Sequence, residues 1–171
     1  MLRQDLSKSD YEPYYEPYIS LVTGENAIEA QERQIADFRA MFDQVAESES
    51  EKLHAPYTWT LKQVVDHLNN NEKVFGYRAL RFSVADQTPL VGYDQDTFAA
   101  NANIQGCSLR QLTDELEYTR RSNLLMFKRF SREAWDRVGM ADGKNISVRA
   151  IAFLQVGHLE HHLQIVRKRL S

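Results

Sequence analysis

The sequence predicts an all-α protein: a four-helix bundle with a long crossover loop between helices two and three and an extended N-terminal arm. Four segments carry apolar residues at three-, four- and seven-residue spacings, which place those residues on one face of a helix. The last three of these segments each begin at a residue suited to cap a helix. We find no convincing strand pattern, and four amphipathic helices bury their apolar faces most economically against one another.

The chain length sets the number of domains. A chain of 171 residues that is 43% hydrophobic can fill one core but hardly two. We therefore expect a single domain over residues 1–171, of which 1–24 form the arm.

The arm and the first helix differ in their proline content. Pro13 and Pro17 interrupt the tyrosine-rich segment 1–24 and forbid a long regular helix there, so we expect an extended arm packed on the body. From Glu25 the pattern becomes helical, and the first helix is expected over about 25–47. Its apolar face holds Ile28, Ile35, Phe38, Phe42 and Val45.

The second helix is expected to begin at Thr60, which stands with Gln63 in the spacing of a capping box, and to fade near Ser83. Residues 84–107 then show little helical period. Twenty-four residues are many for a connection inside one domain, so this segment is either a crossover or a functional loop.

The third and fourth helices also begin at capping residues. Ser108 and Gln111 repeat the capping-box spacing, and a near-heptad apolar stripe follows them to Phe130. After a turn around Gly139 and Gly143, Ser147 can cap a fourth helix that continues to Leu170.

Composition excludes several classes of function. The formal charge of −3 gives no basic field for nucleic acid, and no apolar run approaches the ~20 residues of a membrane span. The N-terminal segment lacks the pattern of a secretion signal, so we expect a cytoplasmic protein. With Cys107 as the only cysteine, any metal must be bound by histidines and carboxylates.

Three histidines are candidate metal ligands. His158 and His162 are four residues apart and therefore emerge on one face of the last helix. His161 also neighbours His158, but projection of the helix turns it away from the apolar face that His162 shares. His67 lies beside the apolar stripe of helix two, where a buried imidazole needs a partner.

Spacing alone leaves the role of these histidines open. Three neutral imidazoles from two helices form a ligand set with open positions, as catalytic zinc sites require. The HxxxH pair lacks the glutamate of HExxH, however, so it is a weak motif, and spacing alone favours histidines that fill a polar position in the core. A non-catalytic helical module that dimerises or binds a partner is then the alternative function.

Two segments resemble the signature regions of the DinB-like superfamily. They are WTLKQVVDHLNNNEKVFGYRALRF and ISVRAIAFLQVGHLEHHLQIVRKRL. The intermediate segments PLVGYDQDTF and SLRQLTDELEYTRRSNLL are similar as well, so the resemblance spans most of the chain. In that superfamily a histidine early in helix two and an HxxxH pair in the last helix hold a divalent metal, which corresponds here to His67, His158 and His162.

The resemblance also implies a chemistry. Members include enzymes that transfer low-molecular-weight thiols and catalyse related isomerisations. We therefore expect a bound zinc or nickel ion, activation of a small thiol or of water, and a thiol S-transferase-like reaction, with a metal-dependent hydrolase as the alternative. A homodimer formed through bundle faces is expected too, because four broad apolar stripes tend to leave residual apolar surface.

The sequence departs from the family pattern near His67. Relatives often carry an acid where Asn70 stands, whereas Glu72 is retained. We expect Glu72 to pair with an arginine or lie on the helix surface, and Asp66 to be solvated. Arg78 shares the face of His67 and fits two roles equally well, a grip on an anionic substrate or an ion pair within the bundle.

Overall fold

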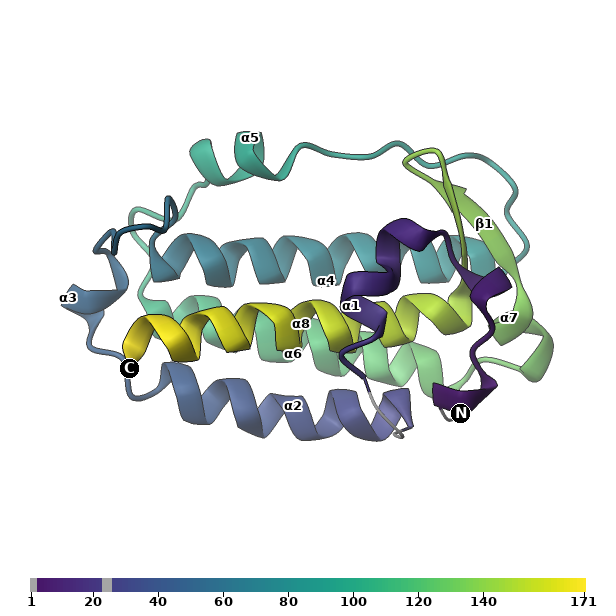
Figure 1. Cartoon of the computed structure of the whole chain (residues 1–171), viewed down its shortest axis with the longest axis horizontal. Helices are drawn as coiled ribbons and strands as arrows, with labels where there is room; N and C mark the ends of the chain where they lie inside the picture. Colours follow the sequence, from purple (N-terminus) through teal and green to yellow (C-terminus); the bar gives the residue numbers. More distant parts are fainter. Residues whose placement is uncertain (1–2, 23–25) are drawn as a thin grey trace.

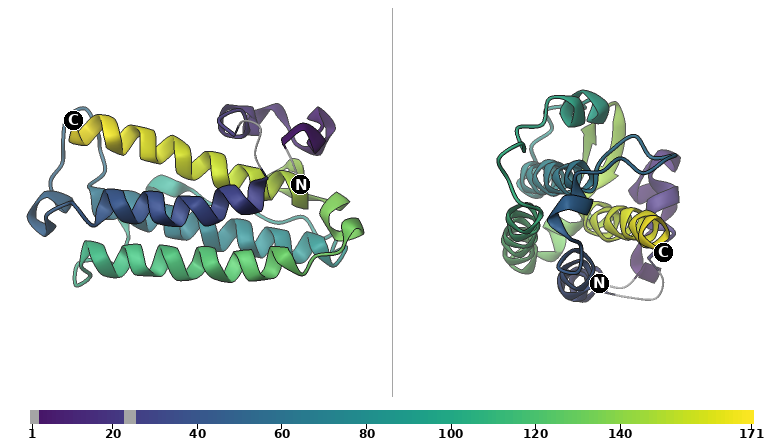
Figure 2. Two further views of the ribbon diagram at one scale, coloured as in Figure 1. Left: turned by 90° about the horizontal axis from the view of Figure 1, so that it is seen from below. Right: turned by 90° about the vertical axis from the view of Figure 1, so that its left-hand side faces the viewer.

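The computed structural model describes residues 3–22 and 26–171. Four long helices form the bundle drawn in Figure 1: α2 (Ala27–Phe42), α4 (Leu61–Ser83), α6 (Leu109–Lys128) and α8 (Val148–Leu170). Both α2 and α4 pack against α6 and α8, so α2 and α4 lie diagonally opposite each other, as the end view in Figure 2 shows. The predicted four-helix bundle is confirmed.

The connection between α4 and α6 runs back along the bundle, so these two helices begin at the same end (Figure 1). It contains the short helix α5 (Gln95–Ala100), whose first turn is capped by Asp94, and it packs against α4. The expected crossover is therefore confirmed. The helix within it was not predicted, because its 6 residues make fewer than two turns and are too few to show a period.

Capping side chains fix where the long helices begin. Thr60 and Gln63 each accept a hydrogen bond from the other's backbone N–H, at 3.2 and 2.9 Å, and Ser108 and Gln111 repeat this arrangement before α6. The Ser147 hydroxyl accepts from the Ala150 N–H at the start of α8. These starts agree with the sequence predictions because caps satisfy backbone donors locally.

The first helix is shorter than predicted. Instead of spanning about 25–47, α2 ends at Phe42, and its predicted start at Glu25 lies outside the described residues. The Val45 N–H donates to the Phe42 carbonyl, which tightens the last turn and takes the chain off the helix axis. A single further turn, α3 (Glu47–Ser50), precedes the loop to α4.

The absence of strands was a wrong prediction. Strands β1 (Val138–Ala141) and β2 (Lys144–Ser147) form an antiparallel hairpin just before α8. Asp142 and Gly143 make its two-residue turn with φ of 54° and 69°. Asp-Gly is a strong signal for such a turn, but the flanking strands are too short to show clear alternation. The short helix α7 (Arg132–Asp136) leads into the hairpin.

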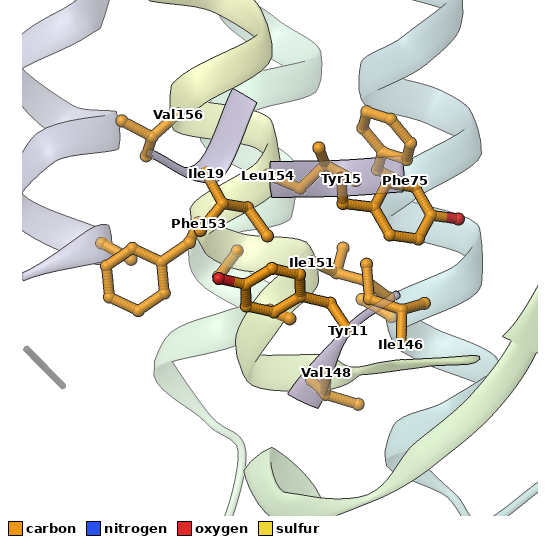
Figure 3. Close-up of a cluster of buried hydrophobic side chains, with 14 of the residues drawn as sticks. Tyr11, Tyr15, Ile19, Phe75, Ile146, Val148, Ile151, Phe153, Leu154 and Val156 are labelled. Atoms are coloured by element: carbon orange, nitrogen blue, oxygen red, sulfur yellow. The ribbon is translucent and has the colours of Figure 1, made fainter. Parts of the chain in front are cut away.

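The described part of the arm is not extended as predicted, because it folds into a series of short helical turns. These are η1 (Arg3–Asp5), η2 (Lys8–Asp10), η3 (Pro13–Tyr15) and α1 (Glu16–Ile19). The arm does pack on the body as expected. Figure 3 shows Tyr11, Tyr15 and Ile19 over the first half of α8, in one buried apolar cluster.

The bundle core consists of two apolar clusters separated by polar side chains. One cluster holds Phe75 and Phe82 together with the arm, and the other holds Leu61 and Leu68 at the opposite end. Between them lie buried polar residues from all four long helices: Gln31, Gln34, Glu72, Arg120, Asn123 and Gln155. No helix of the described chain combines the length and the apolar character needed to cross a membrane.

Candidate metal centre

The structure brings together the three predicted histidines from α4 and α8. One ring nitrogen from each of His67, His158 and His162 lies within 4.8 Å of the others, and the His67 and His158 Nε2 atoms are 3.2 Å apart. His67 and His158 are buried and His162 is partly exposed. The four-residue spacing on α8 and the packing of α8 against α4 together produce this convergence.

The three imidazoles are neutral at pH 7. Burial, followed by the charge of neighbouring histidines, lowers the pKa of His67 to about 4 and that of His162 to about 3. Burial, followed by the charges of the neighbouring histidines and of Arg120, holds the pKa of buried His158 well below 6.5. Neutral imidazoles keep the lone pair that binds a metal ion, so proton release is not needed for metal binding at neutral pH.

The cluster fits a small divalent ion. Zinc binds histidine nitrogens at about 2.0–2.1 Å, which places the nitrogens of a tetrahedral site about 3.3 Å apart. The His67 and His158 nitrogens already have that separation at 3.2 Å, and all three nitrogens lie within 4.8 Å of one another. Three protein nitrogens would leave a coordination position for substrate or water.

Aromatic rings and one amide surround the histidines. The ring centroids of Trp59 and His67 are 5.0 Å apart. The ring centroids of Phe75 and Tyr18 lie 5.9 and 5.4 Å from the ring centroid of His158. The Asn71 amide nitrogen lies 3.0 Å from His67 Nε2, one turn along α4. Sequence reasoning missed Asn71, although its four-residue separation from His67 was a usable signal.

Gly157 lets the arm reach the histidines. A Cβ at this position would lie 2.0 Å from the Tyr18 carbonyl oxygen, so α1 can approach α8 this closely only at a glycine. The approach places the Tyr18 ring against both His158 and His161. His161 lies outside the three-nitrogen cluster, and it is partly exposed like His162.

A cavity of about 330 Å³ adjoins the cluster and is bounded by His158 and Asn71. Four tyrosines from the arm and the crossover loop line it, together with Phe75, Arg78 and Asp142: Tyr14, Tyr15, Tyr18 and Tyr93. Burial raises the pKa of Tyr93 to about 12 and also raises those of Tyr15 and Tyr18, so these hydroxyls stay protonated at neutral pH. The cavity therefore reaches the histidine cluster at His158.

The acidic candidates near His67 have structural partners. Glu72 binds Arg120 in the core, which agrees with the expected arginine partner, and Asp66 accepts a hydrogen bond from Asn70 at 3.0 Å. The partner of His67 within α4 is therefore an amide rather than a carboxylate. Cys107 packs at the edge of an apolar cluster, where it has no visible chemical role.

A family model for the DinB superfamily matches residues 30–166, which is more than half of the chain. The chain belongs to the DinB superfamily. The match includes all three clustered histidines and all four long helices except the first residues of α2 and the last residues of α8. No curated protein sequence matches the chain.

Solved structures share this DinB fold at low sequence identity. YfiT from Bacillus subtilis, described as a probable metal-dependent hydrolase with an unusual four-helix-bundle topology, is 17% identical. The alignment covers 84% of this chain and 85% of YfiT with a TM-score of 0.74. A mycothiol-dependent maleylpyruvate isomerase is 12% identical with a TM-score of 0.69, over 95% of this chain but only 61% of the isomerase.

Proposed function

We propose that this protein is a metal-dependent enzyme in which His67, His158 and His162 hold one divalent ion, zinc or nickel. The observation that carries the proposal is the convergence of three neutral ring nitrogens beside a cavity. A purely structural role does not require this convergence, because buried His67 and His158 forgo hydration and the three imidazoles mutually disfavour protonation. A metal ion would supply the partner that these nitrogens lack.

The reaction we propose is transfer of a small thiol to an electrophile, in a protein of thiol S-transferase type. His67, His158 and His162 would hold the ion, which when bound would lower the pKa of a thiol or water molecule and so provide a nucleophile at neutral pH. The chain itself would bind the substrate in the cavity and shield it from solvent with the rings of Tyr18 and Phe75. The thiol-dependent activity of the isomerase with the same fold supports this choice.

A metal-dependent hydrolase is the second candidate. The description of YfiT as a probable metal-dependent hydrolase favours it, and both reactions need the same activated nucleophile in the same cavity. They differ in whether a thiol or water attacks, and the histidine geometry does not distinguish these nucleophiles.

One set of measurements tests both the metal and the reaction. Protein purified without a polyhistidine tag should contain close to one equivalent of zinc or nickel by elemental analysis. The loaded protein should then consume low-molecular-weight thiols in the presence of electrophilic acceptors. Hydrolysis of esters or amides without thiol consumption would favour the hydrolase, whereas failure to bind metal after reconstitution would favour a non-catalytic helical module.

A further inference from the structure

Arg78 is a buried cation on α4, and its side chain forms no hydrogen bond or ion pair within residues 3–22 and 26–171. The residue is only 6% exposed, and its guanidinium carbon lies 5.8 Å from the centre of the Phe75 ring. Because Arg78 lines the cavity without a counter-ion in contact, an anion that entered the cavity would pair with it and stabilise the folded protein.

Other buried cations of the described chain have carboxylate partners. Lys62 binds Glu47 and Glu51 at 2.5 and 2.6 Å, and Arg120 binds Glu72 at 2.6 Å. The fold thus provides a carboxylate partner for each of these two buried cations. Arg78 departs from that pattern, which favours a ligand rather than a structural partner.

The cavity connects Arg78 to the histidine cluster, since Arg78 lines it together with His158 and Asn71. Seven residues separate Asn71 from Arg78 on α4, a rise of about 10 Å along the helix. Helical side chains lean toward the N-terminus, so the guanidinium is displaced toward Asn71. A molecule of modest length could therefore reach both Arg78 and the histidines.

The charges around Arg78 fit one carboxylate better than a doubly charged phosphate. Three acids also line the cavity, but Asp142 is paired with Lys144, Asp94 caps α5, and Asp96 is exposed. Arg78 is therefore a positive charge that none of these acids contacts directly, although its charge helps to lower the pKa of nearby Asp142, after the stronger effect of Lys144. A planar carboxylate matches the two-pronged donor edge of the guanidinium.

Tyr15 and Tyr93 line the same cavity and can complete the site. Their pKa values are raised by burial, so both hydroxyls remain neutral donors at pH 7. Neither adds a competing negative charge beside the arginine.

We propose that Arg78 binds a carboxylate of the substrate whose reacting atom lies at the histidine cluster. The inference rests on the proposed function for the position of the reacting atom, and it names the substrate class: a small molecule with a carboxylate up to about 10 Å from that atom. Arg78 is then the residue that selects anionic over neutral substrates.

The test uses matched pairs of probes. Calorimetry measures binding of 6-mercaptohexanoate and the neutral 6-mercaptohexanol to the metal-loaded protein, and of hexanoate and hexanol to the metal-free protein. The parent should prefer each carboxylate by roughly tenfold to a hundredfold, since a hydrogen-bonded charge pair replaces an unpaired cation. Arg78→Met should abolish this preference and Arg78→Lys should keep part of it.

Arg81→Met is the matched control. Arg81 lies on the same helix but binds Asp86 and Tyr77, so this variant should keep the carboxylate preference. Arg78→Met should retain the bound metal, and without ligand it should melt at or above the parent's temperature, because it removes an unpaired buried charge. A clear fall in melting temperature would indicate a structural role and overturn the inference.

The remaining outcomes separate the inference from the proposed function. An Arg78→Met protein that still prefers the carboxylates, or a parent that binds acid and alcohol equally, overturns the carboxylate site whatever the metal content. If the protein binds no metal, yet prefers hexanoate to hexanol only when Arg78 is present, the result supports the carboxylate site and contradicts the proposed metal-dependent enzyme. An Arg78→Met protein that does not fold would likewise indicate a structural role for Arg78 and overturn the inference.

Discussion

Arg120 and Glu72 form an ion pair in the middle of the bundle, with the Nη2 and Oε1 atoms 2.6 Å apart and both side chains almost fully buried. Asn123 and Gln155 also donate to the Glu72 carboxylate, and Arg120 donates to Gln34. All four long helices contribute to this network, which separates the two apolar clusters of the core. It also lies on α4 and α8 within a few residues of the histidines.

Glu72→Gln should destabilise the protein by about 3–5 kcal/mol, because the Arg120 charge stays buried without its counter-charge. Urea unfolding measures the loss. Glu115→Gln, which breaks the exposed pair of Glu115 with Lys73, should cost less than about 1 kcal/mol. Equal effects from the two variants would show that burial does not strengthen the core pair.

Replacing any one of His67, His158 or His162 by Ala should severely weaken metal binding, because each change removes one of three proposed ligands. His161→Ala is the control and should bind nearly as much metal as the parent. Elemental analysis after dialysis measures the difference. If His161→Ala lost the metal while His162→Ala kept it, the proposed ligand set would have to be rebuilt on the other face of α8.

Chelation should lower the melting temperature of the metal-loaded parent by about 10 °C, because an ion at a thousand times its dissociation constant contributes about 4 kcal/mol. Thermal unfolding with and without a chelator tests this. The same shift is expected for His161→Ala, and almost none for the three ligand variants. If neither metal nor chelator changed the melting temperature of the parent, the result would argue against a metal site that forms only in the folded state.

Gly157→Ala should destabilise the protein by about 1–3 kcal/mol, although alanine is normally the better helix residue. The added methyl meets the Tyr18 carbonyl, so the arm must move away from α8. Gly106→Ala is the matched control, because no atom lies within 4 Å of a Cβ there. Calorimetric melting compares the two, and a Gly157→Ala protein as stable as the Gly106→Ala protein would show that the arm tolerates displacement.

The homodimer remains a prediction. On α6, Tyr118 and Leu125 are 69% and 71% exposed and lie seven residues apart on one face. We therefore expect this face of α6 to be the residual apolar surface that forms the dimer. Light scattering at micromolar concentration should report a dimer, and Leu125→Glu should shift it to monomer while the loop variant Val91→Glu should not. A parent that is monomeric throughout this range would exclude the dimer.

The sequence by itself determined the features that depend on neighbouring residues. Caps at Thr60, Ser108 and Ser147 fixed the helix starts, and the spacing of His158 and His162 fixed their common face, because hydrogen bonds and helical period act over three or four residues. The Asp142-Gly143 turn was also readable, yet its four-residue strands gave too little alternation to predict the hairpin.

Only the tertiary structure decided which distant residues meet. The distance between His67 and His158 depends on how α4 packs against α8, and the partner of Glu72 depends on α6 lying beside both. Spacing left Arg78 equally suited to an ion pair and to a ligand, because pairing requires a carboxylate from another segment at contact distance. The packed chain supplies such a carboxylate to Arg120 and not, among its described residues, to Arg78.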